Sequence, residues 1–85
     1  MKKIIQEVEG EGLVSLLGKR ITVFCVNYIY TGDLTGVNDA DILLENAAIV
    51  YETGGFTDSE WKDAQPLPQP LYIRTSAIES YTVIR

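Results

Sequence analysis

Hydrophobic and polar positions change their spacing once along the chain, near residue 20. Over residues 3–17 the apolar side chains recur at partly helical intervals. This pattern predicts a short helix or extended arm, followed by a helical turn over residues 13–17. Gly18 is the expected C-terminal cap of that turn, because glycine adopts left-handed backbone angles without strain.

From residue 21 onward the pattern becomes that of five β-strands. The first is rich in β-branched and aromatic side chains on both faces, which is typical of a central, covered strand. Gly32 and Gly36 lie inside the second and mark bulges or sharp bending. Asn38-Asp39 is a turn signal before the third, and residues 75–77 separate the fourth from the fifth. The five predicted strands are residues 21–26, 28–37, 41–51, 71–74 and 78–84.

A long loop rich in glycine and proline is predicted over residues 53–70. Either Thr57 or Asp58 can cap a single helical turn that ends at Trp61. Three prolines alternate with other residues after position 65, which favours an extended path and excludes a central strand. We therefore expect this loop to pair with no strand and to be the most irregular segment outside the termini.

The 85 residues predict a single all-β domain. Its strongly bent strands favour a closed or nearly closed five-stranded antiparallel barrel with a short N-terminal helix. A barrel of this size buries only about 60% of the surface of its unfolded chain. One cysteine and no histidine leave neither an internal disulfide nor a zinc site of the usual kind to stabilise it. Oligomerisation through the strand edges beside residues 75–77 is the stabilisation that remains.

Composition excludes several classes of function. Without histidine there is no Ser-His-Asp or Cys-His arrangement, and no other nucleophile motif is present, so we expect no enzyme activity, cofactor or metal. Twelve acidic residues against seven basic ones give a net charge of −5, which opposes general binding of nucleic acid by charge. The sequence shows no signal-peptide pattern and no uncharged run long enough for a membrane helix, so we expect a cytoplasmic protein that does not contact membranes.

Several short motifs together resemble the Sm and Sm-like protein family. Residues 16–23 (LLGKRITV), 30–37 (YTGDLTGV) and 42–47 (ILLENA) resemble the first family motif, in which Gly-Lys and a strand precede Gly-x-Leu-x-Gly. Residues 71–81 resemble the second, in which Ile-Arg is followed by an isoleucine four residues after the arginine. The resemblance covers most of residues 13–84. It implies an N-terminal helix and a strongly bent, SH3-like five-stranded barrel.

The resemblance also implies a closed homo-oligomeric ring. Family members join the fourth strand of one subunit to the fifth strand of the next, which corresponds here to main-chain pairing between residues 72–75 and 78–83. The expected interface residues are Tyr72, Ile73, Ile78, Tyr81 and Val83.

Family members bind single-stranded RNA rich in uridine or adenosine at the inner rim or face of the ring. The resemblance places the RNA site at Asn38, Asp39, Asp41, Arg74 and Thr75. Asn38 and Asp39 occupy the acidic and stacking region of the base pocket, and Asp41 stands in the place of an asparagine. Arg74 matches the motif arginine, whose flat guanidinium suits base stacking, although it can instead form a salt bridge with Asp39 or Asp41 of the same or a neighbouring subunit. Thr75 stands where the family has glycine.

Two functions therefore stay open. The first is a ring that binds single-stranded RNA, as an RNA chaperone or as the scaffold of a ribonucleoprotein. The second is a structural or protein-interaction ring without an RNA pocket, which the net charge favours, because an ionised Asp41 only accepts hydrogen bonds and repels phosphate. Trp61 has three interpretations: stacking on a nucleotide, docking a partner, or packing over its own loop. Cys25 is interpreted as a small core residue.

Overall fold

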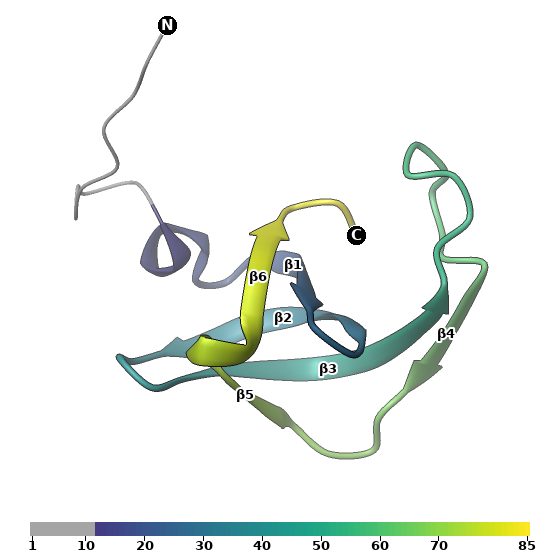
Figure 1. Cartoon of the computed structure of the whole chain (residues 1–85). Helices are drawn as coiled ribbons and strands as arrows, with labels where there is room; N and C mark the ends of the chain where they lie inside the picture. The colour runs from purple at the N-terminus through teal and green to yellow at the C-terminus, as the bar shows by residue number, and fades with distance from the viewer. Residues whose placement is uncertain (1–11) are drawn as a thin grey trace, which may run out of the picture.

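In the computed structural model, which describes residues 12–85, the protein is a bent antiparallel sheet (Figure 1). A single 3-10 turn, η1 (Leu13–Leu16), precedes the sheet, and Gly18 follows it with a φ of 87°, as predicted for the cap. The strands are β1 (Arg20–Cys25), β2 (Ile29–Val37), β3 (Asp41–Glu52), β4 (Asp63–Pro66), β5 (Leu71–Arg74) and β6 (Ile78–Thr82), with a second 3-10 turn, η2 (Thr75–Ala77), between the last two. The helix or arm predicted before residue 12 lies outside the described residues.

The sheet has six strands and does not close into a barrel. Its order is β4-β3-β2-β1-β6, and β5 pairs with β3 beyond the end of β4. The twelve residues of β3 allow this, since β2 runs along one edge and β4 and β5 follow each other along the opposite edge. The prediction of an all-β antiparallel fold is confirmed. The closed form of the predicted barrel is wrong for the protomer, because β5 and β6 diverge from η2 and do not pair (Figure 1).

Strand β4 corrects the prediction of an unpaired loop. Leu67 donates its main-chain N–H to Ala47 at 2.8 Å, and Pro66 lies opposite Ala48 in the same register. Hydrogen-bonded and non-hydrogen-bonded pairs alternate along an antiparallel ladder, so Pro66 occupies a position whose main-chain groups face away from β3. The missing N–H of proline is therefore not needed there, and an edge strand tolerates it.

The predicted bulges in β2 are confirmed. The β2–β3 register shifts between Thr31 and Asp33, around Gly32, and again between Leu34 and Gly36. A Cβ atom at Gly32 would lie 3.0 Å from the Cβ of Leu44, so the strands approach here more closely than a side chain allows.

A polar cluster fixes the strand β3 at the first bulge. Asn46 has a left-handed φ of 49°, and its side-chain amide donates to the Asp33 carboxylate at 3.0 Å. Arg20 donates to the same carboxylate at 3.3 Å and to the main-chain oxygen of Asn46 at 3.0 Å. The hydrogen bond from Asn46, and then that from Arg20 and its charge, lower the pKa of Asp33 against the opposing effect of burial.

We expect this cluster to make a small, pH-dependent contribution to stability. A carboxyl with a lowered folded pKa stabilises the fold above its unfolded pKa, about 3.9, and loses that contribution as the pH falls through its folded pKa. The Arg20 and Asp33 side chains are 41% and 38% exposed, so solvent screening limits the effect to about 0.5 kcal/mol. Thermal melts between neutral and acidic pH should show Asp33→Asn less stable than the parent near neutrality and equal to it in acid. A difference that does not change with pH would contradict this assignment.

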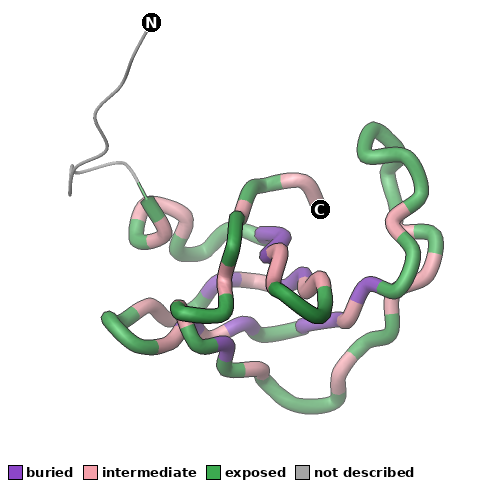
Figure 2. Tube along the Cα trace, viewed as in Figure 1, coloured by how far each residue is buried: buried purple, intermediate pink, exposed green. Residues whose placement is uncertain are grey.

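The core lies between the bent strands and draws on β1, β2, β3 and β5 (Figure 2). Strand β1 is covered on both faces, as predicted: Ile21 and Val23 are buried on one face and Thr22 on the other. Cys25 is half-buried beside this core. Burial, and then the charge of Glu79, raise the pKa of its thiol, which keeps it protonated and suits a core residue. The buried apolar residues of the core cluster are Ile21, Val23, Leu34, Ile42, Leu44, Ala47 and Ile73.

The segment between β3 and β4 folds as a turn instead of the predicted helical turn. The Asp58 carboxylate accepts from the main-chain N–H of Gly55 at 3.0 Å, and the Asp58 N–H donates to the Gly55 oxygen at 3.0 Å. Asp58 thus caps a reversal of the chain, and residues 56–61 contain no helix. Among residues 12–85 there is no helix with the length and apolar character needed to cross a membrane.

Candidate binding site and free strand edges

The five residues predicted to bind RNA lie together where β5 passes into η2. Asp41 is directly opposite Arg74 in the β3–β5 ladder. The main-chain N–H of Thr75 donates to the oxygen of Ala40 at 2.8 Å, and its hydroxyl donates to the oxygen of Asp39 at 3.1 Å. These bonds join the β5–η2 junction to the turn between β2 and β3.

Asn38 forms that turn. Its side-chain oxygen accepts from the main-chain N–H groups of Ala40 and Asp41, both at 2.8 Å, and its own N–H donates to the Asp41 oxygen at 3.0 Å. The turn therefore spans residues 38–40, as the predicted strand bounds leave it. Because the side-chain oxygen of Asn38 already accepts two hydrogen bonds within the turn, Asn38 has a structural role in the site.

A shallow cavity of about 360 Å³ opens beside this junction. Two carboxylates and one guanidinium border it, and the Arg74 side chain makes no hydrogen bond or ion pair with any residue in the described part of the chain. The alternative of a salt bridge from Arg74 to Asp39 or Asp41 is therefore not formed within the protomer. The cavity is lined by Asp39, Ala40, Asp41, Arg74, Thr75 and Ser76.

Thr75 fits in place of glycine because the backbone here is not left-handed. Among residues 12–85 the only residue other than glycine with a positive φ is Asn46. Thr75 instead begins η2, a 3-10 turn, whose preceding residue Arg74 is extended, with φ −67° and ψ 131°. A β-branched side chain is compatible with both conformations.

Strand β5 has one edge that pairs with no strand among residues 12–85, which we call its free edge. Thr75 pairs with Ala40 by a main-chain hydrogen bond, and alternation along the ladder makes Ile73 the next residue bonded to β3. The main-chain groups of Tyr72 and Arg74 therefore face away from β3. Of the predicted interface residues on this strand, Tyr72 is 69% exposed, whereas the side chain of Ile73 is buried in the core and its main chain is directed to β3.

Strand β6 presents a second free edge, since it pairs only with β1 in the described part of the chain. Cys25 donates its N–H to the Tyr28 oxygen at 3.0 Å, so the odd-numbered residues of β1 bond to β2. Thr22 and Phe24 then bond to β6, opposite Thr82 and Ser80. Tyr81, between these two, directs its main-chain groups outward. The other predicted interface residues beside it are Ile78, which is half-buried, and Val83, which is 52% exposed.

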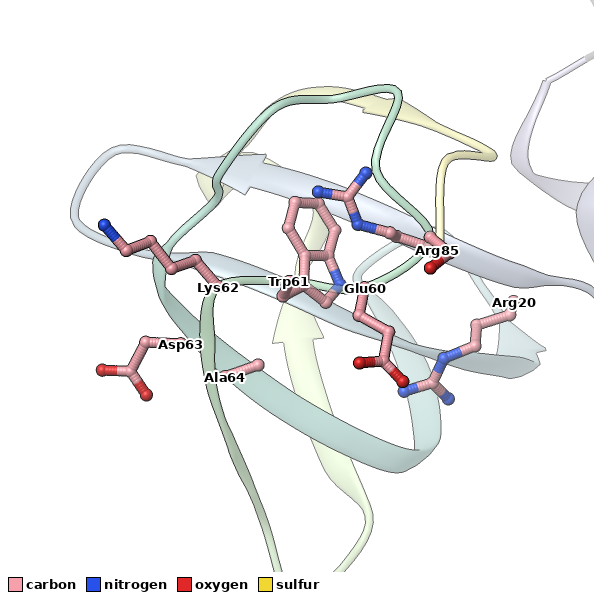
Figure 3. Close-up of a pocket in the computed structure, with 8 residues that line it drawn as sticks. Arg20, Glu60, Trp61, Lys62, Asp63, Ala64 and Arg85 are labelled. Carbon is pink, nitrogen blue, oxygen red and sulfur yellow. The ribbon is translucent and has the colours of Figure 1, made fainter.

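A second cavity, of about 500 Å³, lies next to the loop before β4 (Figure 3). Arg85 stacks on Trp61, with the guanidinium carbon 3.9 Å from the ring centroid, and its terminal nitrogens donate to the oxygens of Thr53, Gly55 and Phe56 at 2.8–3.1 Å. This packing agrees with the interpretation of Trp61 as a residue that packs over its own loop, and binding of a nucleotide or a partner stays a prediction. The sequence did not predict the role of Arg85. The one feature that pointed to it was Thr22, a polar residue inside an otherwise apolar strand.

Comparison of the chain with protein-family models and with curated proteins finds no match.

Proposed function

We propose that the protein is a ring-forming, Sm-like protein that binds single-stranded RNA rich in uridine or adenosine. Two features of the protomer support a ring. Within residues 12–85 the β5 edge at Tyr72 and Arg74 and the β6 edge at Tyr81 each carry main-chain groups that pair with no strand. Such edges pair with a neighbouring chain unless they are protected. Pairing β5 of one protomer with β6 of the next uses both edges and repeats from subunit to subunit.

The observation that carries the RNA proposal is the position of Arg74. Its main chain lies on the free edge, and its side chain borders the cavity of about 360 Å³ without an ionic partner among residues 12–85. A free guanidinium beside a cavity can stack on an unpaired base and donate hydrogen bonds to its edge. Closure of a ring would repeat this arginine once in each subunit.

A protein-interaction ring is the second candidate, and the charges near the cavity favour it. Asp39 and Asp41 border the same cavity, and each subunit carries a net charge of −5. Phosphate contacts gain little from counterion release where the local field is negative. RNA binding, if it is the function, should therefore be weak.

Two substitutions at the cavity test this function. Arg74→Ala should weaken binding of uridine- or adenosine-rich oligomers at least about tenfold, the value of one charged hydrogen bond. Asp41→Asn should strengthen it by a similar factor, because it removes a charge and adds an amide donor. Filter binding across a salt series measures both effects.

The matched control is Glu45→Gln, which removes one charge from an exposed position of β3 that does not line the cavity. An improvement with Asp41→Asn that exceeds that of the control supports a site at the cavity. Unchanged binding in both cavity variants would exclude the RNA site and leave the protein-interaction ring as the function.

A further inference from the structure

Two buried N–H groups without acceptors lie beside the cavity of about 500 Å³. They are Nε1 of Trp61 and Nε of Arg85, and both are shielded from solvent and have no partner among the described residues. Buried donors in native proteins are almost always paired, because an unpaired one is costly. Two such groups on residues that stack on each other indicate a place where an acceptor binds.

The surrounding protein groups do not supply that acceptor. The terminal nitrogens of Arg85 are held by three main-chain oxygens of the loop, which fixes its guanidinium over Trp61. In Figure 3 the carboxylate of Glu60, an exposed residue that lines the same cavity, points toward Arg20, and it forms no hydrogen bond with either donor. Because Glu60 is exposed, its side chain can give way to a ligand.

The guanidinium of Arg85 favours an occupant with negative charge. Of the three basic residues in the lining, Arg20 and Lys62 form ion pairs with Asp33 and Glu52, whereas Arg85 has no ionic partner among residues 12–85. The volume is in the range of small-molecule sites and exceeds what an inorganic ion fills. The apolar part of the cavity is the ring of Trp61 and the methyl group of Ala64.

We propose that this cavity binds a small organic anion, whose carboxylate or phosphate oxygens accept hydrogen bonds from Trp61 Nε1 and Arg85 Nε. The apolar body of the ligand packs along the indole. None of the residues lining this cavity lines the cavity at Arg74, so the site is independent of the proposed RNA function.

Titration with three probes tests the site. Trp61 is the only tryptophan of the chain, so its fluorescence reports on the cavity directly. At constant ionic strength, uridine monophosphate or citrate should change this fluorescence saturably and raise the melting temperature, whereas neutral uridine should not. Saturation by the nucleotide alone assigns a phosphate, and saturation by citrate alone assigns a carboxylate. Absence of saturation by both anions up to about 10 mM would overturn the proposal.

Variants identify the donors. Glu60→Gln removes the competing carboxylate and should tighten anion binding several-fold, whereas Glu45→Gln, which removes the same charge from a residue outside this lining, should tighten it less. Trp61→Phe keeps an aromatic ring under Arg85 but lacks the N–H, and calorimetry should show binding about tenfold weaker. Arg74→Ala should leave anion binding unchanged, which separates this site from the RNA site. Equal affinities in Glu60→Gln and Glu45→Gln would contradict the site, whatever the stability of the tryptophan variant.

Discussion

Tyr72→Pro is expected to convert a multi-subunit particle into a folded monomer. The N–H of Tyr72 faces away from β3, so the protomer loses no internal hydrogen bond when proline removes it. Between subunits the same N–H is one of the few donors that the short β5 edge offers, and its loss interrupts the proposed pairing with β6. Light scattering after size-exclusion chromatography measures the particle, and circular dichroism checks the fold.

The adjacent position provides the matched control. Ile73 bonds to β3 and its side chain is 6% exposed, so Ile73→Pro should destabilise the protomer itself by roughly 1–3 kcal/mol. This substitution tests the interior of the fold, although sequence analysis assigned Ile73 to the interface. A Tyr72→Pro particle as resistant to dilution as the parent would place the interface elsewhere. A parent chain that runs as a 9.5 kDa monomer at micromolar concentration would exclude the ring.

Gly32→Ala is expected to destabilise the protomer by roughly 1–3 kcal/mol, the usual cost of overpacking a core. The added Cβ would lie 3.0 Å from Leu44 Cβ, 3.2 Å from Ala47 Cα and 3.2 Å from the main-chain oxygen of Glu45. Leu44 and Ala47 are at most 1% exposed and have no space to move into. Urea unfolding in the monomeric Tyr72→Pro background measures the effect without a contribution from assembly.

Gly36→Ala is the comparison for this variant. Its Cβ would meet only the side chain of Leu43, at 3.2 Å, and Leu43 is half-buried and can shift. The expected loss of stability is therefore smaller. Equal unfolding midpoints for the two alanine variants would show that the close approach at Gly32 does not limit the packing of the sheet.

The sequence predicted most strands because their signals are local. Apolar runs bounded by turn residues located β1, β2, β3, β5 and β6, and the glycines at 32 and 36 located the bulges. Strand β4 was not predicted because Pro66 argues against pairing. A proline excludes a strand only where a main-chain N–H is needed, and the register of Pro66 against Ala48 shows that none is needed there. Whether β5 and β6 pair with each other depends on the path of η2 in space. A local sequence pattern does not contain this path.

The two candidate sites also differ in how far the sequence predicts them. The cavity at Arg74 could be anticipated, because the family resemblance places Arg74 and the Asn38 turn together and the fold brings them together. The cavity at Trp61 could not, since it depends on where the last residue of the sequence crosses the sheet. The hydroxyls of Thr22 and Thr31 donate to the main-chain oxygen of Arg85 there, and this long-range contact sets the position of the guanidinium.

Arg74 belongs to a free strand edge through its main chain and to a cavity through its side chain. If the edge pairs only between subunits, occupancy of the cavity and self-association are thermodynamically linked through this one residue. A ligand that prefers the assembled form then lowers the protein concentration at which subunits associate, and assembly tightens ligand binding by the same free energy. The affinity of such a ligand would depend on how much protein is present, so a single dissociation constant would describe it only at a fixed protein concentration.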